Sequence, residues 1–209
     1  MSNNATDLPA LVEYGVATLP FPGETESGDQ YVVRSFENGT LIAVADGLGH
    51  GPKAAIAAKA AVALLETYAR ESVVPLLKRC HKELVKTRGA AVSLASINVS
   101  STATMTWAGV GNVTGLFWHA DPNVDRAHER LLLRGGVVGY RLPPLRIVTI
   151  PIVPGDTLIL GTDGLHSSFS EALTMEASPQ QIADRIHAEY RRGTDDSLVL
   201  VARYVGRPI

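Results

Sequence analysis

Residues 41–58 read LIAVADGLGHGPKAAIAA, and this stretch changes character twice. It opens with a continuous apolar run, residues 41–44, which is typical of a buried strand. Asp46 then leads into a turn rich in glycine, where backbone can approach a ligand closely. Pro52 suits the first turn of a helix, because its missing amide hydrogen is not needed there. The stretch therefore predicts a strand that ends at a carboxylate and is followed by a helix.

The role of Asp46 has two interpretations. A carboxylate at a strand end, beside a bare backbone carbonyl, is a good site for a hard divalent cation. Alternatively, Asp46 lies in a tight strand-to-helix turn and only accepts hydrogen bonds from nearby amides. The stretch itself does not separate the two, so the decision depends on acidic residues elsewhere in the chain.

Composition narrows the class of protein. The chain has 209 residues, of which 45% are hydrophobic, and we expect residues 1–209 to form one domain with a flexible, polar N-terminus at 1–9. A net charge of −2 argues against nucleic-acid and anionic-membrane partners. Residues 1–9 lack the pattern of a signal peptide, and no window approaches the ~20 apolar residues of a membrane span. We expect a cytoplasmic monomer.

A hairpin is predicted just before this turn. Residues 29–36 have a strand pattern, and Glu37-Asn38-Gly39 is a turn sequence. The two strands that flank the turn then pair antiparallel, so Asp29 starts one strand where Asp46 ends the other. Both carboxylates are expected at the same edge of a sheet.

The rest of the chain alternates between helical and strand periodicity. Two antiparallel sheets with helices outside them account for this order. Helices are predicted at residues 52–70, 74–88, 165–172 and 179–192, and further strands at 11–19, 91–99, 102–110, 113–119, 129–134, 146–150, 157–161 and 197–204.

Two more aspartates lie at the ends of apolar strands. Asp163 follows one such run in LILGTDG, and Asp195 precedes the last strand in GTDDS. Each of these residues alone is common in caps and turns. Together with Asp29 and Asp46 they are harder to explain in this way, because like charges at one sheet edge repel each other unless cations neutralise them.

Five motifs occur in a characteristic order: SGDQY, VADGLGHG, WAGVGN, GTDGL and GTDDSLVLV, from residue 27 to residue 201. With this set the chain resembles the PP2C-like (PPM) metal-dependent serine/threonine phosphatases, and most of all the short bacterial branch that includes the SpoIIE phosphatase domain and the stressosome phosphatase RsbX. The resemblance implies an α/β (α+β) fold: an α-β-β-α sandwich of two antiparallel sheets flanked by helices.

The resemblance also implies a centre of two Mn²⁺ or Mg²⁺ ions, with a third ion as an alternative. Asp46 would bridge both ions, and the carbonyl of Gly47 would complete the coordination of one. Asp163 and Asp195 would hold the other ion, with Asp195 rather than its neighbour at the ligand position. Asp29 would bind metal directly or through water. Catalysis would then rest on Asp46, Asp163 and Asp29.

The implied reaction is direct attack of a metal-activated water on phosphoserine or phosphothreonine, and the implied partners are phosphorylated STAS-domain proteins of the stressosome. Many family members carry an arginine before the first acidic residue to bind the phosphate, and residues 21–28 contain none. Phosphate binding would then rest on the metals alone, or on Arg141 or Arg146. His50 follows the glycine turn of the family, where it would either orient a water molecule or phosphate or have only a structural role. The single cysteine, Cys80, lies in a helical stripe and is expected in the core.

Two other functions remain as alternatives. One is a catalytically silent module of the same fold that shields phosphorylated sites. The other is an ATP-binding regulator kinase, since DGLG is similar to the glycine box of anti-sigma kinases. That box is D-x-G-x-G, whereas the glycines here lie one, three and five residues after Asp46. The kinase is therefore disfavoured.

Overall fold

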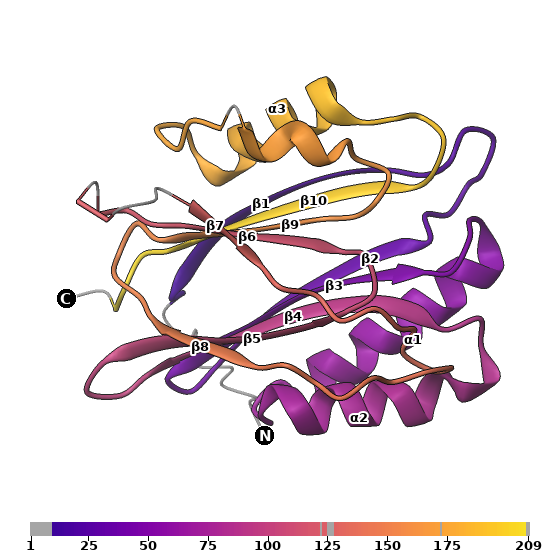
Figure 1. Ribbon diagram of the computed structural model, residues 1–209, viewed down its shortest axis with the longest axis horizontal. Coiled ribbons are helices and arrows are strands. Elements are labelled where there is room, and N and C mark those ends of the chain that lie inside the picture. Colours follow the sequence, from indigo (N-terminus) through magenta and orange to yellow (C-terminus); the bar gives the residue numbers. More distant parts are fainter. Residues whose placement is uncertain (1–9, 122, 125–127, 172, 208–209) are drawn as a thin grey trace, which may run out of the picture.

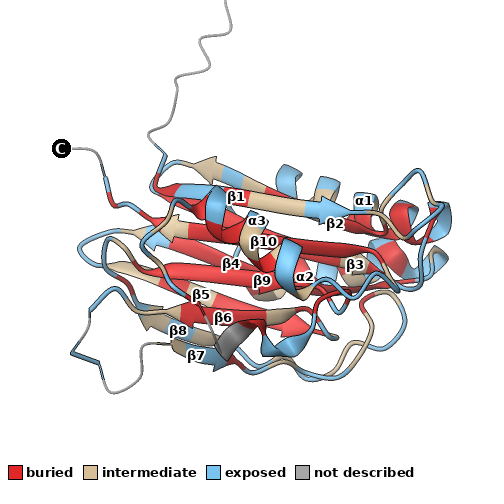
Figure 2. Ribbon diagram, turned by 90° about the horizontal axis from the view of Figure 1, so that it is seen from above, coloured by how far each residue is buried: buried red, intermediate tan, exposed pale blue. Residues whose placement is uncertain are grey.

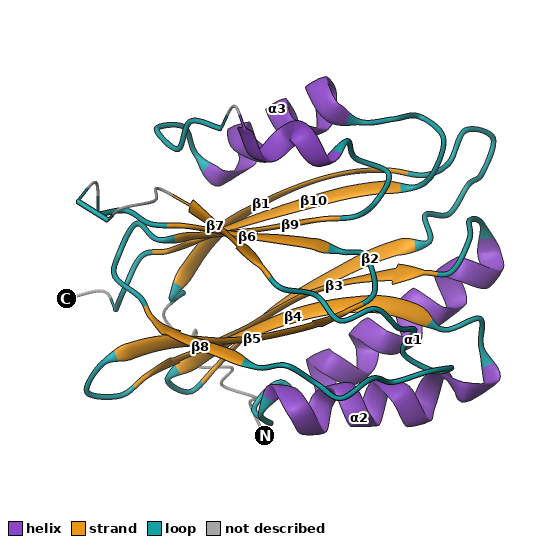
Figure 3. Ribbon diagram, viewed as in Figure 1, coloured by secondary structure: helices purple, strands orange, loops and turns teal. Residues whose placement is uncertain are grey.

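The computed structural model describes residues 10–121, 123–124, 128–171 and 173–207, so the flexible N-terminus expected at residues 1–9 lies outside the described residues. Two five-stranded antiparallel sheets lie face to face, with helices on both outer faces (Figures 1 and 3). The α-β-β-α sandwich expected from the sequence is confirmed.

Each sheet combines strands from early and late parts of the chain. The first sheet has the order β2-β3-β4-β5-β8 and the second β1-β10-β9-β6-β7. The strands are β1 Val12–Leu19, β2 Asp29–Phe36, β3 Gly39–Gly47, β4 Ala90–Val99, β5 Ala103–Val110, β6 Thr114–Trp118, β7 His128–Leu131, β8 Val148–Pro151, β9 Thr157–Gly161 and β10 Ser197–Tyr204.

Three layers of apolar side chains hold the sandwich together. Helices α1 (Pro52–Thr67) and α2 (Val73–Glu83) pack on the outer face of the first sheet, and α3 (Pro179–Tyr190) packs on the outer face of the second. A third layer, around the fully buried Trp107, fills the space between the sheets. Figure 2 shows that buried residues concentrate in the central strands, which explains why those strands are almost continuously apolar.

The hairpin predicted at residues 37–39 is confirmed. Asn38 has a positive φ of 61°, as a tight turn requires, and β2 pairs antiparallel with β3. In this register Asp29 lies directly opposite Asp46. Pro52 is in the first turn of α1, as predicted. Alanines on the inner face of this helix are fully buried against the sheet, which brings its backbone close to β3.

All four helix predictions were too long: those at 52–70 and 179–192 ran a few residues past the ends of α1 and α3, and the other two differ more. The second helix ends at Glu83 and continues only as the 3₁₀ turn Leu84–Lys86, because Thr87 donates both its amide and its hydroxyl hydrogen to the Leu84 carbonyl. The segment after β9 forms only the 3₁₀ helix Ser167–Glu171. None of the described helices has the length and apolar character needed to cross a lipid bilayer.

Cys80 lies in the core, as expected, where its Sγ contacts the Ala61 carbonyl at 4.0 Å between α1 and α2. Burial raises the pKa of its thiol to about 12. We therefore expect no labelling of the native protein by iodoacetamide at pH 8, and full labelling in denaturant. Truncation in Cys80→Ala should lower the free energy of unfolding by about 1–2 kcal/mol in a urea titration. Rapid labelling of the native protein would contradict this placement.

Candidate metal centre

The two sheets bring the predicted acidic residues to one edge of the sandwich. In the first sheet, Asp29 begins β2 and Asp46 lies near the end of β3. In the second sheet, Asp163 follows β9 and Asp195 precedes β10, and these two strands are antiparallel neighbours. The Oγ1 of Thr162 donates a hydrogen bond of 2.8 Å to Asp29 Oδ2 and so joins the two edges. Residues that are far apart in the sequence thus share one site.

The electrostatics of this edge favour a bound cation. Burial raises the pKa of Asp29 to about 8 and that of Asp46 to about 9, and repulsion from the neighbouring carboxylates adds to both shifts. The pKa of Asp163 is also raised, first by burial and then by the charge of Asp195. A divalent cation reverses this repulsion, because it attracts the ionised form of every carboxylate around it.

Asp196 adds a further buried carboxylate, with 3% of its surface exposed. Its Oδ1 accepts a hydrogen bond of 2.8 Å from the Phe21 amide, whereas Oδ2 is buried and has no hydrogen-bond partner among the described residues. The Asp196 amide in turn donates to Asp195 Oδ1 at 2.9 Å. A buried oxygen without a partner costs free energy that a cation or its hydration water would offset.

These donors fit the metal that the sequence implies. Within the described ranges, no three His, Cys, Asp or Glu side chains converge closely enough to form a ready-made metal cluster. The donors are all carboxylate and carbonyl oxygens, the ligands that Mg²⁺ and Mn²⁺ prefer. A hard cation bound at this edge would draw these mutually repelling carboxylates together.

Position 47, at this edge, requires a glycine because helix α1 leaves no room for a side chain. A Cβ atom at this position would collide with the Ala54 carbonyl in the first turns of α1. The Gly47 amide donates a hydrogen bond of 3.0 Å to the Gly28 carbonyl, which ties the end of β3 to the start of β2. The main chain of Gly47 is therefore fixed at the end of β3, and its carbonyl is a candidate metal ligand.

Three residues near the carboxylates were not singled out from the sequence. Thr162 contacts Asp29, as described above, and Asn112 donates a hydrogen bond of 2.6 Å to Asp163 Oδ2. The positive charge of Arg192 opposes the upward shift of the Asp163 pKa. Thr162 and Asn112 belong to the GTDGL and WAGVGN motifs, so the motifs carried a signal for both.

We expect Thr162→Val to weaken the site without changing its shape. The substitution removes the bond to Asp29 and leaves the Leu198 amide, which now donates to Thr162 Oγ1 at 2.9 Å, without its acceptor. The free energy of unfolding should fall by about 1–2 kcal/mol in urea, and Mn²⁺ affinity by about tenfold or more in calorimetric titration. The control is Thr67→Val at the exposed end of α1. Equal Mn²⁺ affinity in both variants would contradict a positioning role for Thr162.

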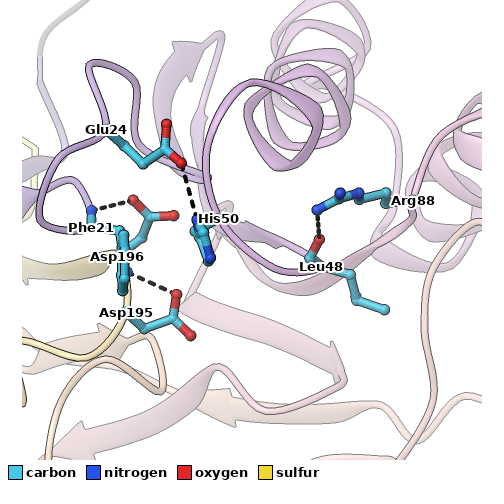
Figure 4. A network of polar contacts seen from close by, with 7 residues as sticks. All are labelled: Phe21, Glu24, Leu48, His50, Arg88, Asp195 and Asp196. Atoms are coloured by element: carbon cyan, nitrogen blue, oxygen red, sulfur yellow. Dashed lines mark hydrogen bonds and ion pairs between the residues drawn. The ribbon is translucent and has the colours of Figure 1, made fainter.

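His50 lies at the mouth of this edge, in the network drawn in Figure 4. Its Nδ1 is 3.1 Å from Glu24 Oε1, and its ring stacks on Phe21 with centroids 4.2 Å apart. The Phe21 amide is bonded to Asp196, so the loop between β1 and β2 is attached both to His50 and to the carboxylates. His50 is thus held in place beside the candidate site.

Arg141 and Arg146 are both exposed. Neither side chain forms a hydrogen bond or an ion pair with a carboxylate among the described residues. Arg141 is in the turn that closes on Val137, and its neighbour Val138 forms a bridge with Ala90 close to the site edge. Arg192, in contrast, lowers the pKa of the candidate ligand Asp163 through its positive charge.

Comparison with known proteins identifies the family. The model of the family Stage II sporulation protein E (SpoIIE) matches residues 37–205, which include most of the carboxylate edge. The chain belongs to the SpoIIE family. It is therefore a member of the PPM-type serine/threonine phosphatases, as the motif set predicted.

Individual SpoIIE-type relatives agree with this assignment. The phosphoserine phosphatase RsbX of Bacillus subtilis (strain 168) is 30% identical over 144 residues, which are 69% of this chain and 70% of that protein. A structure of RsbX in complex with magnesium has a TM-score of 0.81 at 25% identity and covers 92% of this chain and 94% of the other.

Two more solved structures are similar. One comes from work on the bacterial stressosome as a modular system adapted to control secondary messenger signalling; its TM-score is 0.82 at 30% identity, over 92% of this chain and 99% of that one. The structure of the PP2C phosphatase domain and part of the regulatory domain of SpoIIE from Bacillus subtilis shares the fold, with a TM-score of 0.74 at 21% identity over 95% of this chain and 64% of that one. The fold is therefore PP2C-like.

Proposed function

We propose that this chain is a metal-dependent phosphatase that hydrolyses phosphoserine or phosphothreonine on STAS-domain proteins of a stressosome, as a monomer in the cytoplasm. One observation carries the proposal: aspartates from both sheets share one edge, where burial and mutual repulsion raise the pKa of Asp29 and Asp46. The similarity to a phosphoserine phosphatase and to a structure from work on the bacterial stressosome supports the choice of substrate.

The proposed ligands follow from their positions at this edge. Asp46 would bridge two ions, Mn²⁺ or Mg²⁺, with the Gly47 carbonyl beside it, and Asp163, Asp195 and Asp29 would complete the set. The similar RsbX structure was solved with magnesium, which supports a divalent cation here. When bound, such ions lower the pKa of water and offset the charge that develops on the phosphoryl oxygens.

The surrounding residues of the chain hold this donor set in place. Thr162 fixes Asp29 through its hydroxyl group, and Asn112 orients Asp163 through its side-chain amide. His50 is held through Nδ1 by Glu24, and its other ring nitrogen would be the one to contact a water molecule or a phosphoryl oxygen. No covalent phospho-enzyme is needed, and the buried Cys80 thiol is out of reach of a substrate.

The proposal is tested by measuring phosphate release from a phosphorylated STAS-domain protein with purified enzyme. We expect turnover with Mn²⁺ or Mg²⁺ and none with EDTA. p-Nitrophenyl phosphate serves as a control for the chemistry alone. Turnover of the small ester without turnover of any phosphorylated STAS-domain protein would overturn the substrate. If neither substrate is hydrolysed by folded, metal-loaded protein, the phosphatase proposal itself fails and the silent binding module replaces it.

A further inference from the structure

A pocket of about 250 Å³ lies beside the glycine-rich turn that leads into α1. Two of its lining residues, Lys53 and Ile56, come from the first turns of α1. The other three, Lys86, Thr87 and Arg88, belong to the segment between α2 and β4. Nothing in the proposed two-metal chemistry uses this pocket.

The pocket is basic, although the whole chain has a net charge of −2. Lys53, Lys86 and Arg88 are all exposed, and none of them forms an ion pair with a described acidic residue. Helix α1 has no acidic residue in its first turn and no side-chain cap, so its positive end adds to the same potential. The pocket therefore offers three unpaired cationic groups to an anionic ligand.

An apolar surface accompanies these charges. The side chain of Ile56 is 59% exposed, even though it lies on a helix whose inner face is fully buried. Cationic groups around an exposed aliphatic side chain match a peptide that combines acidic and apolar residues better than they match a free phosphate ion.

The pocket is attached to the candidate metal centre through the backbone. Arg88 Nη1 donates a hydrogen bond of 3.4 Å to the Leu48 carbonyl, and Figure 4 shows the guanidinium group directed at this carbonyl. The Leu48 amide donates to the Gly89 carbonyl at 3.1 Å. Leu48 is two residues after Asp46, so one short loop carries a proposed metal ligand and contacts the wall of the pocket.

We propose that this pocket binds an acidic segment of the phosphoprotein substrate, adjacent to the phosphorylated residue. The identity of the occupant rests on the proposed function, whereas the preference for an acidic peptide rests on the pocket alone. The proposal also accounts for the absence of arginine at residues 21–28, because binding energy from a remote part of a protein substrate can replace a direct grip on the phosphate. Complementary charge also increases the association rate and helps to select the partner.

The test compares two phosphoserine peptides that differ only in their flanks, one with three glutamates and one with three glutamines. For the unmodified enzyme we expect kcat/KM to be about tenfold higher for the acidic peptide at low salt, and this advantage to shrink in 0.5 M NaCl. Fluorescence anisotropy with the acidic peptide lacking phosphate gives a second readout that needs no turnover.

The decisive variant is the double charge reversal Lys53→Glu with Lys86→Glu. We expect the advantage of the acidic peptide to be lost and its Kd in the anisotropy assay to rise at least tenfold, while p-nitrophenyl phosphate, which is too small to span both sites, keeps its kcat/KM within about twofold. The matched control, Lys78→Glu with Lys82→Glu, makes the same change of charge at exposed positions of α2 outside the pocket. The control should behave like the unmodified enzyme.

The outcomes separate this inference from the proposed function. Equal hydrolysis of both phosphopeptides, or equal loss in both double variants, overturns the pocket and leaves the phosphatase intact. Binding of the acidic peptide that is lost only in the pocket variant, without hydrolysis of any substrate, supports the pocket and overturns the phosphatase. Loss of hydrolysis of the small ester in the pocket variant also overturns the inference, because the pocket would then act on the chemistry rather than on docking.

Discussion

Replacing Asp46 with asparagine should lower kcat for a phosphorylated protein substrate by at least about 10³-fold. Asp46 is the proposed bridging ligand, and asparagine has nearly the same size but supplies one neutral carbonyl oxygen in place of two charged ones. Phosphate release under saturating Mn²⁺ measures the effect. The size of the loss reflects the charge that two cations offset in the transition state.

The control for this experiment is Asp184→Asn on the exposed face of α3. It removes the same charge from the chain and should leave kcat unchanged within about twofold. A folded Asp46→Asn enzyme that retains a tenth or more of the activity would contradict a bridging role. Circular dichroism establishes that the variant is folded before its kinetics are compared.

Removing the metal should make the stability of the protein depend on pH in an unusual direction. Burial raises the pKa of Asp29 to about 8 and that of Asp46 to about 9, from the usual 3.8. Between the usual pKa of 3.8 and these raised values, the unfolded chain has already lost the protons that the folded chain still holds. The stabilisation is therefore complete below about pH 4 and is lost as the pH rises through 8 to 9.

Thermal unfolding measures this dependence. In EDTA we expect Tm to fall by at least about 5 °C between pH 6 and pH 8.5. With excess Mg²⁺ the fall should disappear, because the cation neutralises the ionised carboxylates and stabilises the folded state in proportion to its binding. Asp46→Asn should flatten the curve in EDTA and raise Tm at pH 8.5. A metal-free protein that becomes more stable over this pH range would contradict the placement of these two carboxylates.

Local patterns in the sequence predicted the parts of the site that lie within one hairpin. The turn at residues 37–39 fixed the register of β2 and β3, and this register alone placed Asp29 opposite Asp46. Apolar runs of strand length likewise predicted β9 and β10, with Asp163 and Asp195 at their ends. These elements were predictable because hairpin geometry and strand periodicity act over short distances.

The parts that joined the two sheets were not predictable in this way. The hydrogen bond from Thr162 to Asp29 spans 133 residues of sequence and depends on how the sheets pack. The unpaired oxygen of Asp196 depends on the loop that brings the Phe21 amide to its other oxygen. No local sequence pattern predicts either feature. Only the ordered set of motifs indicated that these residues share one site.

Cationic side chains near the site were hard to predict for the same reason. A loop rich in glycine and proline favoured Arg141 and Arg146, whereas the structure shows Arg192 lowering the pKa of Asp163. The basic pocket joins Lys53 with Lys86, which are distant in sequence. α1 packs against α2 and the 3₁₀ turn that follows it, and the Leu48 amide donates a hydrogen bond to the Gly89 carbonyl in the same region.

Anomalous diffraction from crystals grown with Mn²⁺ tests the central claim most directly. The account predicts two manganese peaks at the edge shared by the two sheets, with Asp46 in contact with both and the Gly47 carbonyl in contact with one. Asp163 and Asp195 should contact the other ion. Manganese bound elsewhere, or no manganese at this edge in crystals of active protein, would contradict it.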